Sequence, residues 1–342
     1  MLAAFYVGPG QIEVKKVAAP KPGPGEVLVK VGTCGICGSD LHFYRGDIPI
    51  LSQVSPGHEL AGEIVALGDG VEGWECGQRV IIEPLKVCRE CSYCRSGQYQ
   101  LCNQRKLMGT FIPGGMAQYL CAPAYGLYSL PDSLSYDLGA MVEPLAVAVH
   151  ALHLAELALG ERVLVLGSGS IGLMVVLAAR AAGAEDIVTT YRYPHQGEAA
   201  LAAGAQHAIT SNEAGTPALM AEAQRRPFDL VVETVGGQAD TVQQAVNVVR
   251  PGGRVCLLGL FTQSIGLNPL LLALKEVRIV GGLTYCRPGQ QSDFDAALGI
   301  IEAAPERAQR LISHRFSLEQ AATAFAAAAD KSTRSLKVQL HP

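Results

Sequence analysis

Four cysteines that lie close together in the chain have the spacing of a metal site. They occur in the run CRECSYCRSGQYQLC, with the pattern C-x2-C-x2-C-x7-C, as Cys88, Cys91, Cys94 and Cys102. Four thiolates at this spacing can close a tetrahedron around one ion, and Zn²⁺ suits a soft, closed site of this kind. Disulfides or a 4Fe–4S cluster are the alternatives, and both are less favoured because cytosolic thiols stay reduced and no partner redox motif accompanies the run. A closed zinc site performs no reaction, so the reacting residues must lie elsewhere.

A second group of metal-ligand and proton-carrying residues is spread over the motifs CGICGSDLHFYRG, PGHELAGEIVALG and AMVEPLAVAVHAL. Its members are Cys37, Ser39, His42, His58, Glu59 and Glu143. One thiolate, one imidazole and one or two carboxylates could hold a zinc ion with one position left open, which is the coordination that a catalytic site needs. The glycines beside Cys37 and His58 favour tight loops around such a site.

The run RVLVLGSGSIGLMVVLAARAAGA has the pattern of a dinucleotide site, with Gly167, Gly169 and Gly172 between an apolar strand pattern and a long helical pattern. The first glycine permits the tight turn, the second lets the backbone approach a pyrophosphate, and the third allows close packing of helix on strand. Ser168 and Ile171 lie within this segment, where the helix N-terminus supplies N–H groups to the phosphates. A merely structural glycine turn is the alternative, but the strand before it and the helix after it favour the nucleotide site.

The residues that follow the second strand of this pattern bear on the choice of cofactor. An NAD site usually places Asp or Glu there to bind the ribose hydroxyls, whereas IVTTYRYPHQ has Tyr191 followed by Arg192. A guanidinium near the 2′ position favours a 2′-phosphate, and the missing carboxylate removes its repulsion. We therefore predict NADP(H) over NAD(H). In the alternative interpretation, Arg192 is solvated and Tyr191 only packs on the adenine.

The elements that must position these residues divide the chain into parts. Residues 1–145 contain Gly, Pro and short β-rich runs, which predict an irregular β-barrel domain with a helix after Gly38. Residues 146–280 alternate helical periodicity with the apolar runs RVLVLG, DIVTT, FDLVVET, GRVCLLG and VRIVGG, which predicts a doubly wound parallel sheet. Residues 281–342 hold a helix near 292–303 and a strand near 335–340, and we expect them to return to the first domain. The fold class is α/β.

Composition limits the partners. The 342 residues carry a formal net charge of −4 with a pI near 6.1 and no basic run, which argues against a nucleic-acid partner. The N-terminus lacks the pattern of a signal peptide, and no apolar run is long enough to cross a bilayer. We expect a cytoplasmic protein, no membrane partner and a small-molecule substrate.

The motifs CGICGSD, GHE, the four-cysteine run, the EP at 143–144 and GxGxxG together resemble the zinc-containing medium-chain alcohol and polyol dehydrogenases, most closely the sorbitol and threonine dehydrogenase branch. The resemblance covers nearly the whole chain. It implies a GroES-like catalytic domain with a Rossmann domain, two zinc ions per chain and a homodimer or homotetramer. It also implies reversible hydride transfer between a secondary alcohol, of polyol, sugar or amino-alcohol type, and a nicotinamide cofactor.

Carried over residue by residue, the resemblance implies that Cys37, His58 and Glu59 bind the catalytic zinc, with Glu143 as a direct or water-bridged ligand. Ser39 would hydrogen-bond the reacting oxygen, and its alternative is a helix cap. His42 would help to pass the proton towards solvent, and its alternative is a simple loop residue.

The substrate is the least constrained part of this prediction. Where polyol dehydrogenases have an arginine that binds substrate hydroxyls, GGLTYCRPG has Thr284, with Arg287 three residues beyond. Tyr44, Phe111 and Tyr285 are candidate pocket walls, with ordinary packing as the alternative.

Three other functions stay open. One is a zinc-independent reductase with the same two-domain plan, which is disfavoured by the presence of Cys37, His58 and Glu143. The others are a reductase acting mainly on ketones or aldehydes and a zinc-bearing NADP(H)-binding protein without turnover.

Overall fold

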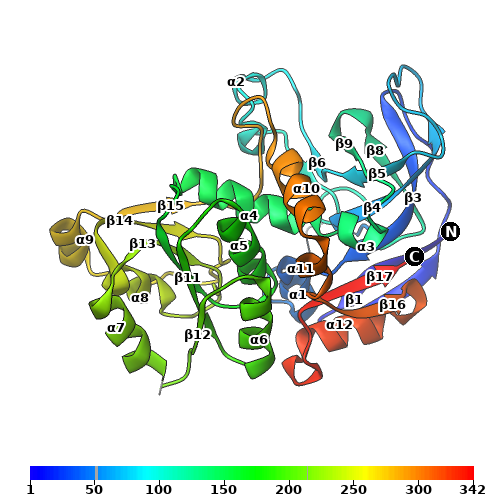
Figure 1. Ribbon diagram of the computed structural model, residues 1–342. Coiled ribbons are helices and arrows are strands. Elements are labelled where there is room, and N and C mark those ends of the chain that lie inside the picture. The colour runs from blue at the N-terminus through cyan, green and yellow to red at the C-terminus, as the bar shows by residue number, and fades with distance from the viewer. Residues whose placement is uncertain (51–52, 214) are drawn as a thin grey trace. The chain divides into compact units, whose positions relative to one another are not determined.

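The computed structural model describes residues 1–50, 53–213 and 215–342, and the chain forms two compact units (Figure 1). The first, called here the barrel unit, comprises Met1–Glu143 and Cys286–Pro342, and the second, the nucleotide unit, comprises Pro144–Tyr285. Helix α4 (Val142–Leu154) carries the chain from the first unit into the second. The C-terminal segment is therefore part of the same unit as the N-terminal residues.

The barrel unit is built on a seven-stranded sheet with the strand order β16-β17-β3-β4-β5-β9, in which β8 pairs with another stretch of β3. All these neighbours are antiparallel except β16 and β17. The strands and helices of this unit besides α4 are β1 (Leu2–Gly8), β2 (Gln11–Lys16), β3 (Glu26–Gly35), α1 (Gly38–Arg45), β4 (Glu59–Leu67), β5 (Arg79–Ile82), β6 (Leu85–Lys86), α2 (Ser92–Arg95), η1 (Tyr99–Leu101), β7 (Lys106–Leu107), β8 (Tyr119–Pro123), η2 (Ala124–Gly126), β9 (Leu127–Ser129), α3 (Tyr136–Gly139), α10 (Asp293–Ala303), α11 (Pro305–Gln309), β16 (Ile312–Ser317), η3 (Leu318–Gln320), α12 (Ala321–Ala329), η4 (Lys331–Thr333) and β17 (Lys337–His341).

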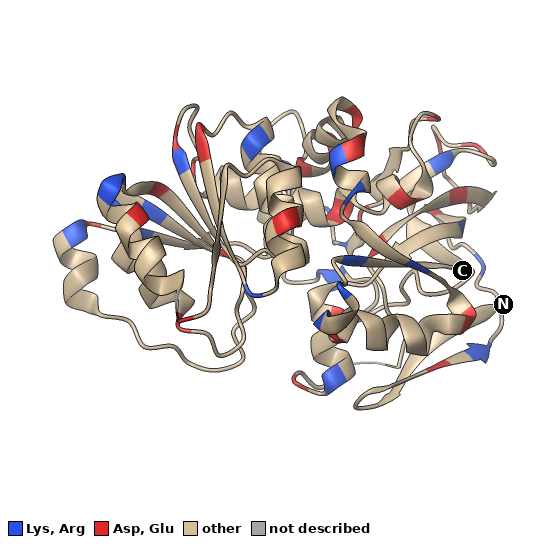
Figure 2. Ribbon diagram, turned by 60° about the horizontal axis from the view of Figure 1, so that its bottom comes forward, with Lys and Arg blue, Asp and Glu red and all other residues tan. Residues whose placement is uncertain are grey.

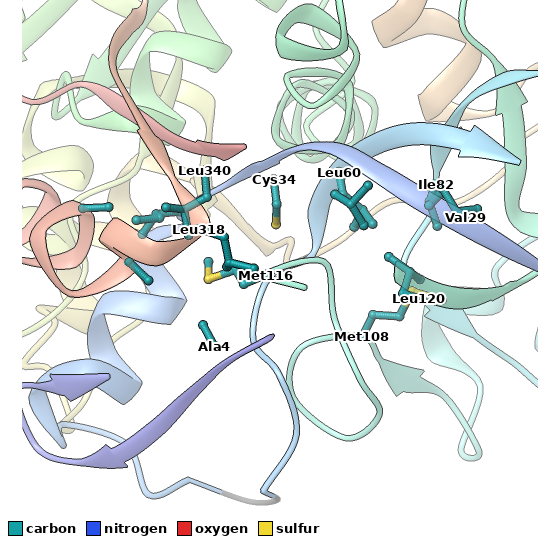
Figure 3. Packing of buried hydrophobic residues seen from close by; sticks show 14 of the residues in the cluster. Ala4, Val29, Cys34, Leu60, Ile82, Met108, Met116, Leu120, Leu318 and Leu340 are labelled. Atoms are coloured by element: carbon teal, nitrogen blue, oxygen red, sulfur yellow. The ribbon is translucent and has the colours of Figure 1, made fainter. Parts of the chain in front are cut away.

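The core of the barrel unit joins segments from both ends of the chain. Every second residue of β3 from Val27 to Val31 is buried, which is the period of a strand with one face on a core. These valines pack in one cluster with Leu60, Met116 and Leu340, so that strands near the N-terminus and the last strand share a core (Figure 3). The irregular β-rich domain predicted from the sequence is confirmed, and so is the helix after Gly38.

The nucleotide unit is a six-stranded parallel sheet with the order β12-β11-β10-β13-β14-β15. The five apolar runs singled out in the sequence are all strands, and β12, which is short and half exposed, is a strand that the sequence analysis missed. The elements of this unit besides α4 are β10 (Arg162–Leu166), α5 (Ser170–Ala181), β11 (Asp186–Tyr191), α6 (Pro194–Ala203), β12 (His207–Thr210), α7 (Gly215–Arg225), β13 (Phe228–Glu233), α8 (Thr241–Val248), β14 (Val249–Leu257), α9 (Pro269–Lys275) and β15 (Arg278–Gly281).

The order of the strands locates the part of the sheet where a ligand can bind. The chain runs outwards from β10 through β11 to β12 and then restarts at β13 on the other side of β10. Helices α5 and α6 pack together, and α8 packs with α7 and α9 (Figure 1). In doubly wound sheets, ligands bind beyond the carboxyl ends of the strands where the direction of winding reverses. That point lies between β10 and β13.

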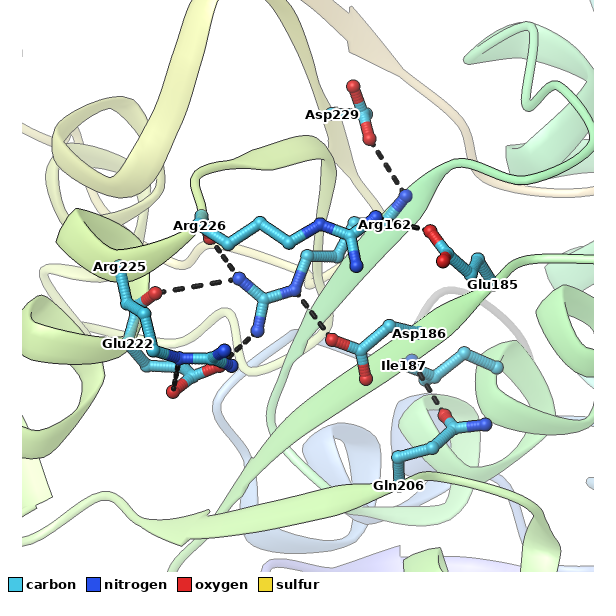
Figure 4. Close-up of polar contacts among 9 residues, drawn as sticks. All are labelled: Arg162, Glu185, Asp186, Ile187, Gln206, Glu222, Arg225, Arg226 and Asp229. Atoms are coloured by element: carbon cyan, nitrogen blue, oxygen red, sulfur yellow. Dashed lines mark hydrogen bonds and ion pairs between the residues drawn. The ribbon is translucent and has the colours of Figure 1, made fainter.

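At the opposite, amino-terminal edge of this sheet, one buried arginine joins three strands and a helix. The guanidinium of Arg162 is fully buried, and its Nε donates to Asp186 Oδ2 at 2.6 Å, while its other nitrogens contact Glu222 and the carbonyl of Arg226 (Figure 4). The Arg162 backbone N–H donates to Asp229 Oδ2 at 2.8 Å. A buried guanidinium needs such partners because an unpaired charge there is costly. This network stabilises the sheet and lies at the opposite ends of the strands from the place where a ligand would bind.

Charged residues of both signs are distributed over both units (Figure 2). Among the described residues, no helix is long and apolar enough to cross a lipid bilayer.

Candidate functional site

The four-cysteine lobe has the geometry of a tetrahedral metal site. The four sulfur atoms of Cys88, Cys91, Cys94 and Cys102 all lie within 4.8 Å of one another. The Cys88 sulfur is 3.8 Å from that of Cys94 and 3.6 Å from that of Cys102. A zinc ion with Zn–S bonds of about 2.3 Å needs edges of about 3.8 Å between its sulfur ligands. The backbone N–H groups of Glu90 and Cys91 lower the pKa of the Cys88 thiol to about 6, whereas burial and the neighbouring thiols raise the pKa of Cys94 to about 12. These residues therefore fit a zinc ion.

A buried carboxyl group fixes this lobe to the barrel. Tyr99, which lies between the third and fourth cysteines, donates its hydroxyl to Glu83 Oε2 at 3.0 Å, and Tyr128 on β9 donates to the same oxygen at 3.0 Å. Burial raises the pKa of Glu83 to about 7, although both hydroxyls act in the opposite direction. On the other side, the Arg287 N–H donates to the Gly97 carbonyl at 3.0 Å. The lobe is thus held by the barrel and by the C-terminal segment.

The second predicted site is organised by helix α1, whose N-cap residue is Cys37. The backbone N–H of Cys37 donates to Asp40 Oδ2 at 3.0 Å, and the hydroxyl of Tyr6 donates to Asp40 Oδ1 at 3.3 Å. Helix α1 ends at Gly46, whose φ of 81° suits glycine. The backbone that carries the Cys37 thiol is therefore fixed by buried contacts, while the thiol itself remains partly accessible.

His58 lies next to this thiol, in the loop immediately before β4. Its Nδ1 is buried with no hydrogen-bond partner among the described residues. Burial alone lowers the pKa of His58, but the negative charges of Asp40, Cys37 and Glu143 outweigh burial and raise the pKa above its ordinary value. His58 therefore lies within electrostatic reach of a thiol and two carboxyl groups, although the described part of the chain does not bring three of the predicted ligand atoms of this site within 4.8 Å of one another.

The structure brings Glu59 into the same cluster but gives its carboxylate to another residue. Lys337 on β17 donates to Glu59 Oε1 at 2.6 Å and to Oε2 at 2.7 Å, and both side chains are 1% exposed. Lys337 is also 3.4 Å from the carbonyl of Ile36, next to Cys37. The carboxylate of Glu143 lies close enough to raise the pKa of Lys337 together with Glu59 and Cys37, against the effect of burial. Both carboxylate oxygens of Glu59, one of the two glutamates predicted as ligands, are therefore held by the Lys337 ammonium group.

Sequence reasoning missed Lys337, although a signal for it exists. SLKVQL places one lysine in the last strand, and every residue of β17 from Lys337 to Leu340 is buried. A lysine in a buried strand needs a partner. The pairing of β17 with β3, which sets Leu340 opposite Cys34, brings that lysine to the start of β4. Only the register of strands from opposite ends of the chain identifies Glu59 as the partner.

The two predicted proton carriers lie on α1. Ser39 is half-buried in the first turn, and its hydroxyl makes no hydrogen bond within the described part of the chain. His42, one turn further, is 20% exposed at its side chain, and its Nδ1 lies 3.0 Å from Asp47 Oδ2. A hydroxyl and a partly exposed imidazole on one helix could pass a proton from a buried position to solvent.

In the nucleotide unit, the predicted glycine turn joins β10 to α5. Gly167 has a φ of 97°, and a Cβ on Gly172 would lie 1.9 Å from the Gly167 carbonyl oxygen, so both positions require glycine. Gly169 is the N-cap of α5 and has open space around its Cα. The Ile171 side chain is half-buried, whereas Ser168 is 1% exposed and its hydroxyl donates to the Thr190 carbonyl at 2.8 Å. Ser168 can therefore offer a phosphate its backbone N–H but not its hydroxyl.

Tyr191 and Arg192 lie at the carboxyl end of β11, beside the strand that carries the turn. The Tyr191 ring packs against Gly197 of α6, where an added Cβ would lie 2.7 Å from the ring. Arg192 is exposed, and its guanidinium lies 5.6 Å from the centre of the Tyr193 ring. The described residues provide no carboxylate that pairs with this guanidinium, so it is available for an anion.

The residues considered for substrate binding differ in how far they are buried and in what they contact. Tyr44 packs in the barrel core with its ring 5.2 Å from that of Phe325, and Tyr285 is fully buried. Phe111 is exposed. The Arg287 guanidinium donates to the Gln290 carbonyl at 2.8 Å and so serves the loop before α10. Packing therefore accounts for Tyr44, and local contacts account for Arg287.

Comparison with known proteins agrees with this geometry. The family model of the alcohol dehydrogenase GroES-like domain matches residues 23–132, and that of the zinc-binding dehydrogenases matches residues 170–303. Sorbitol dehydrogenase from Bacillus subtilis (strain 168) is 34% identical over 349 residues, which cover 100% of this chain and 97% of that protein.

Two solved structures have the same architecture along the whole chain. A zinc-binding dehydrogenase from Sinorhizobium meliloti 1021 bound to NADP has 30% identity and a TM-score of 0.88, with 100% of this chain and 99% of that chain covered. An alcohol dehydrogenase from Escherichia coli CFT073 in complex with NADH has 26% identity and a TM-score of 0.92, with the same coverage. The matched family models, the similarity to sorbitol dehydrogenase along the whole chain and the glycine turn lead to one conclusion: the chain belongs to the zinc-containing medium-chain alcohol and polyol dehydrogenases.

Proposed function

We propose that this alcohol or polyol dehydrogenase uses zinc and NADP(H) to transfer a hydride reversibly between a secondary alcohol and its ketone. The observation that carries the proposal is the placement of Cys37, at the start of α1, near the buried side chain of His58. The glycine turn after β10 and the exposed Arg192 supply the complementary nucleotide site.

The catalytic metal would be held by Cys37 and His58, with Glu143 as a direct or water-bridged ligand. Glu59 completes the predicted set, but its two contacts with Lys337 favour Glu143 over Glu59 as the carboxylate that would reach the metal. When bound, zinc supplies a Lewis acid that stabilises negative charge on the reacting oxygen, and the nicotinamide accepts the hydride. The four-cysteine lobe would hold a second, structural zinc.

The chain's own residues would handle the proton. Ser39, with a hydroxyl not engaged by the described residues, would hydrogen-bond the reacting oxygen and release its own proton as it takes the one from the substrate hydroxyl, and His42 would help to pass the released proton towards solvent. Asp47 orients the His42 ring through Nδ1, so that Nε2 is the atom left to exchange a proton. Burial of His58 in the barrel unit would limit the access of water to one side of the reacting oxygen.

The preference for NADP(H) rests on Arg192 and on the fact that position 191 is a tyrosine and not an acidic residue. Arg192→Ala is expected to weaken NADPH binding roughly tenfold or more, because a charge-assisted contact with the 2′-phosphate is lost. NADH, which lacks that phosphate, should bind about as before. Fluorescence titration of both cofactors measures the two effects. Arg180→Ala, which removes an exposed arginine at the end of α5, is the control and should change neither. An equal loss for NADPH and NADH would remove the cofactor proposal.

The substrate class proposed is a secondary alcohol of a polyol, sugar or amino-alcohol, as the similarity to sorbitol dehydrogenase suggests. The test is a panel of such alcohols and their ketones with each cofactor, followed at the nicotinamide absorbance with and without a chelator. We expect turnover that the chelator abolishes and that added zinc restores. Cofactor binding without turnover on any member of the panel would favour a binding protein, and activity only with carbonyl substrates would favour a reductase.

We further propose that the chain forms a homodimer or homotetramer. Strand β15 is the edge of the six-stranded sheet, and it leaves backbone groups open to pairing. Helix α9, which packs on β14, exposes Leu270 and Leu274 at 65% and 72%. A second copy placed on this edge would cover both features. Since four thiols of one lobe must stay reduced to bind zinc, we also place the enzyme in the cytoplasm.

A further inference from the structure

The glycine turn of the nucleotide unit is held from both sides by threonine hydroxyls. On one side, the backbone N–H of Gly167 donates to Thr190 Oγ1 on β11 at 2.9 Å. On the other, the Thr234 hydroxyl, just after β13, lies 2.8 Å from the Leu166 carbonyl oxygen and 3.0 Å from that of Gly167. Both backbone polar groups of the first motif glycine are therefore satisfied by side chains from the two strands that flank β10.

The hydroxyls on the β11 side are buried and belong to one connected network. Thr190 is 4% exposed. The Ser168 hydroxyl lies 2.7 Å from that of Thr189 and donates to the Thr190 carbonyl at 2.8 Å, and Thr189 donates to the Val165 carbonyl at 3.1 Å. Buried hydroxyls are costly without partners, and here each has one within the turn or the adjoining strands.

The packing leaves the turn little freedom. A Cβ on Gly167 would lie 3.1 Å from Thr234 Oγ1, and a Cβ on Gly172 would lie 2.8 Å from the same atom. Thr234 thus contacts the turn and the first turn of α5 at once. The backbone N–H of Gly167 already donates to Thr190 and is not available to a ligand. The N–H groups that can bind a ligand are those at the start of α5, because the first N–H groups of a helix have no partner within it.

We propose that Thr190 and Thr234 are positioning residues for the dinucleotide, which fix the turn so that the first N–H groups of α5 meet the pyrophosphate. This inference rests on the proposed function. Neither residue touches the reacting atoms, and neither belongs to the glycine motif. Their role is to keep the phosphate site formed before the cofactor arrives, so that binding does not have to order the turn.

The test uses Thr190→Val and Thr234→Val, which keep the shape of the side chain and remove only the hydroxyl. Each is expected to weaken NADPH roughly tenfold in fluorescence titration, because a buried backbone group loses its partner and the turn loses its fixed geometry. Thr190→Ser and Thr234→Ser restore the hydroxyl and should restore most of the affinity. The affinity for 2′-AMP, which has the 2′-phosphate but no pyrophosphate, should change less than about twofold in every variant.

Thr33→Val is the matched control, because Thr33 is buried in the barrel unit and donates its hydroxyl to Asp137 Oδ1 at 2.9 Å. It should lower the melting temperature without changing NADPH affinity. Wild-type affinity in both valine variants at the turn, or serine variants that bind as weakly as the valine ones, would overturn the inference while leaving the proposed function intact. A wild-type protein that binds neither NADPH nor NADH would contradict the proposed function, and this inference with it.

Discussion

Cys37→Ser is expected to lower kcat/KM by about a thousandfold or more while leaving the Kd for NADPH nearly unchanged. The thiol is partly accessible and lies at the start of α1. Its replacement by a hydroxyl removes a soft ligand, and the loss of the several kcal/mol that a Lewis acid contributes corresponds to a rate change of this size. Serine is a favourable N-cap, so α1 should still form.

Zinc content and cofactor affinity separate this effect from unfolding. The wild-type protein should contain two zinc ions per chain and the Cys37→Ser variant one, because the four-cysteine lobe is unaffected. Cys76→Ser is the control, since Cys76 is an exposed thiol in the same unit, and this variant should keep both ions and full activity. Normal turnover in Cys37→Ser, or an unchanged zinc content, would contradict the assignment of the catalytic metal.

The features that could be predicted from the sequence are those that a short stretch of chain defines. Four cysteines within fifteen residues are close enough in the chain to bind one metal ion together. Three glycines between an apolar strand and a helix are typical of a dinucleotide-binding turn. The alternation of apolar strands with helices likewise predicted the parallel sheet, because both periods are local properties. Strand β12 was missed since its four residues are half exposed and carry no apolar run.

The features that could not be predicted depend on contacts between distant residues. Thr190 and Thr234 are ordinary strand residues in the sequence, and only the order of β11, β10 and β13 sets them on either side of Gly167. Tyr44 follows the CGICGSD motif closely enough to suggest a pocket wall, yet the C-terminal helix α12 brings Phe325 against it. The contacts of such side chains depend on long-range packing, and a local sequence pattern cannot predict them.

The contact between Glu59 and Lys337 shows the same limitation at the candidate active site. The two residues are 278 positions apart, and the family resemblance of the GHE motif predicted Glu59 as a metal ligand. In the structure, both oxygens of this carboxylate accept hydrogen bonds from the Lys337 ammonium group. Because both partners are 1% exposed, water cannot compensate either charge if the other is removed.

Lys337→Met is therefore expected to reduce the free energy of unfolding by about 3–5 kcal/mol, the usual cost of leaving a buried charge without its partner. Urea denaturation measures the change. Glu59→Gln combined with Lys337→Met removes both charges and should recover most of the loss, since two neutral side chains of similar length fill the same space.

Lys331→Met is the control, because the Lys331 ammonium contacts the Ala328 carbonyl and the Ser335 hydroxyl rather than a carboxylate. A double variant no more stable than Lys337→Met alone would show that the lysine acts through packing. Recovery in the double variant with full zinc content would assign the metal to Cys37, His58 and Glu143 without Glu59.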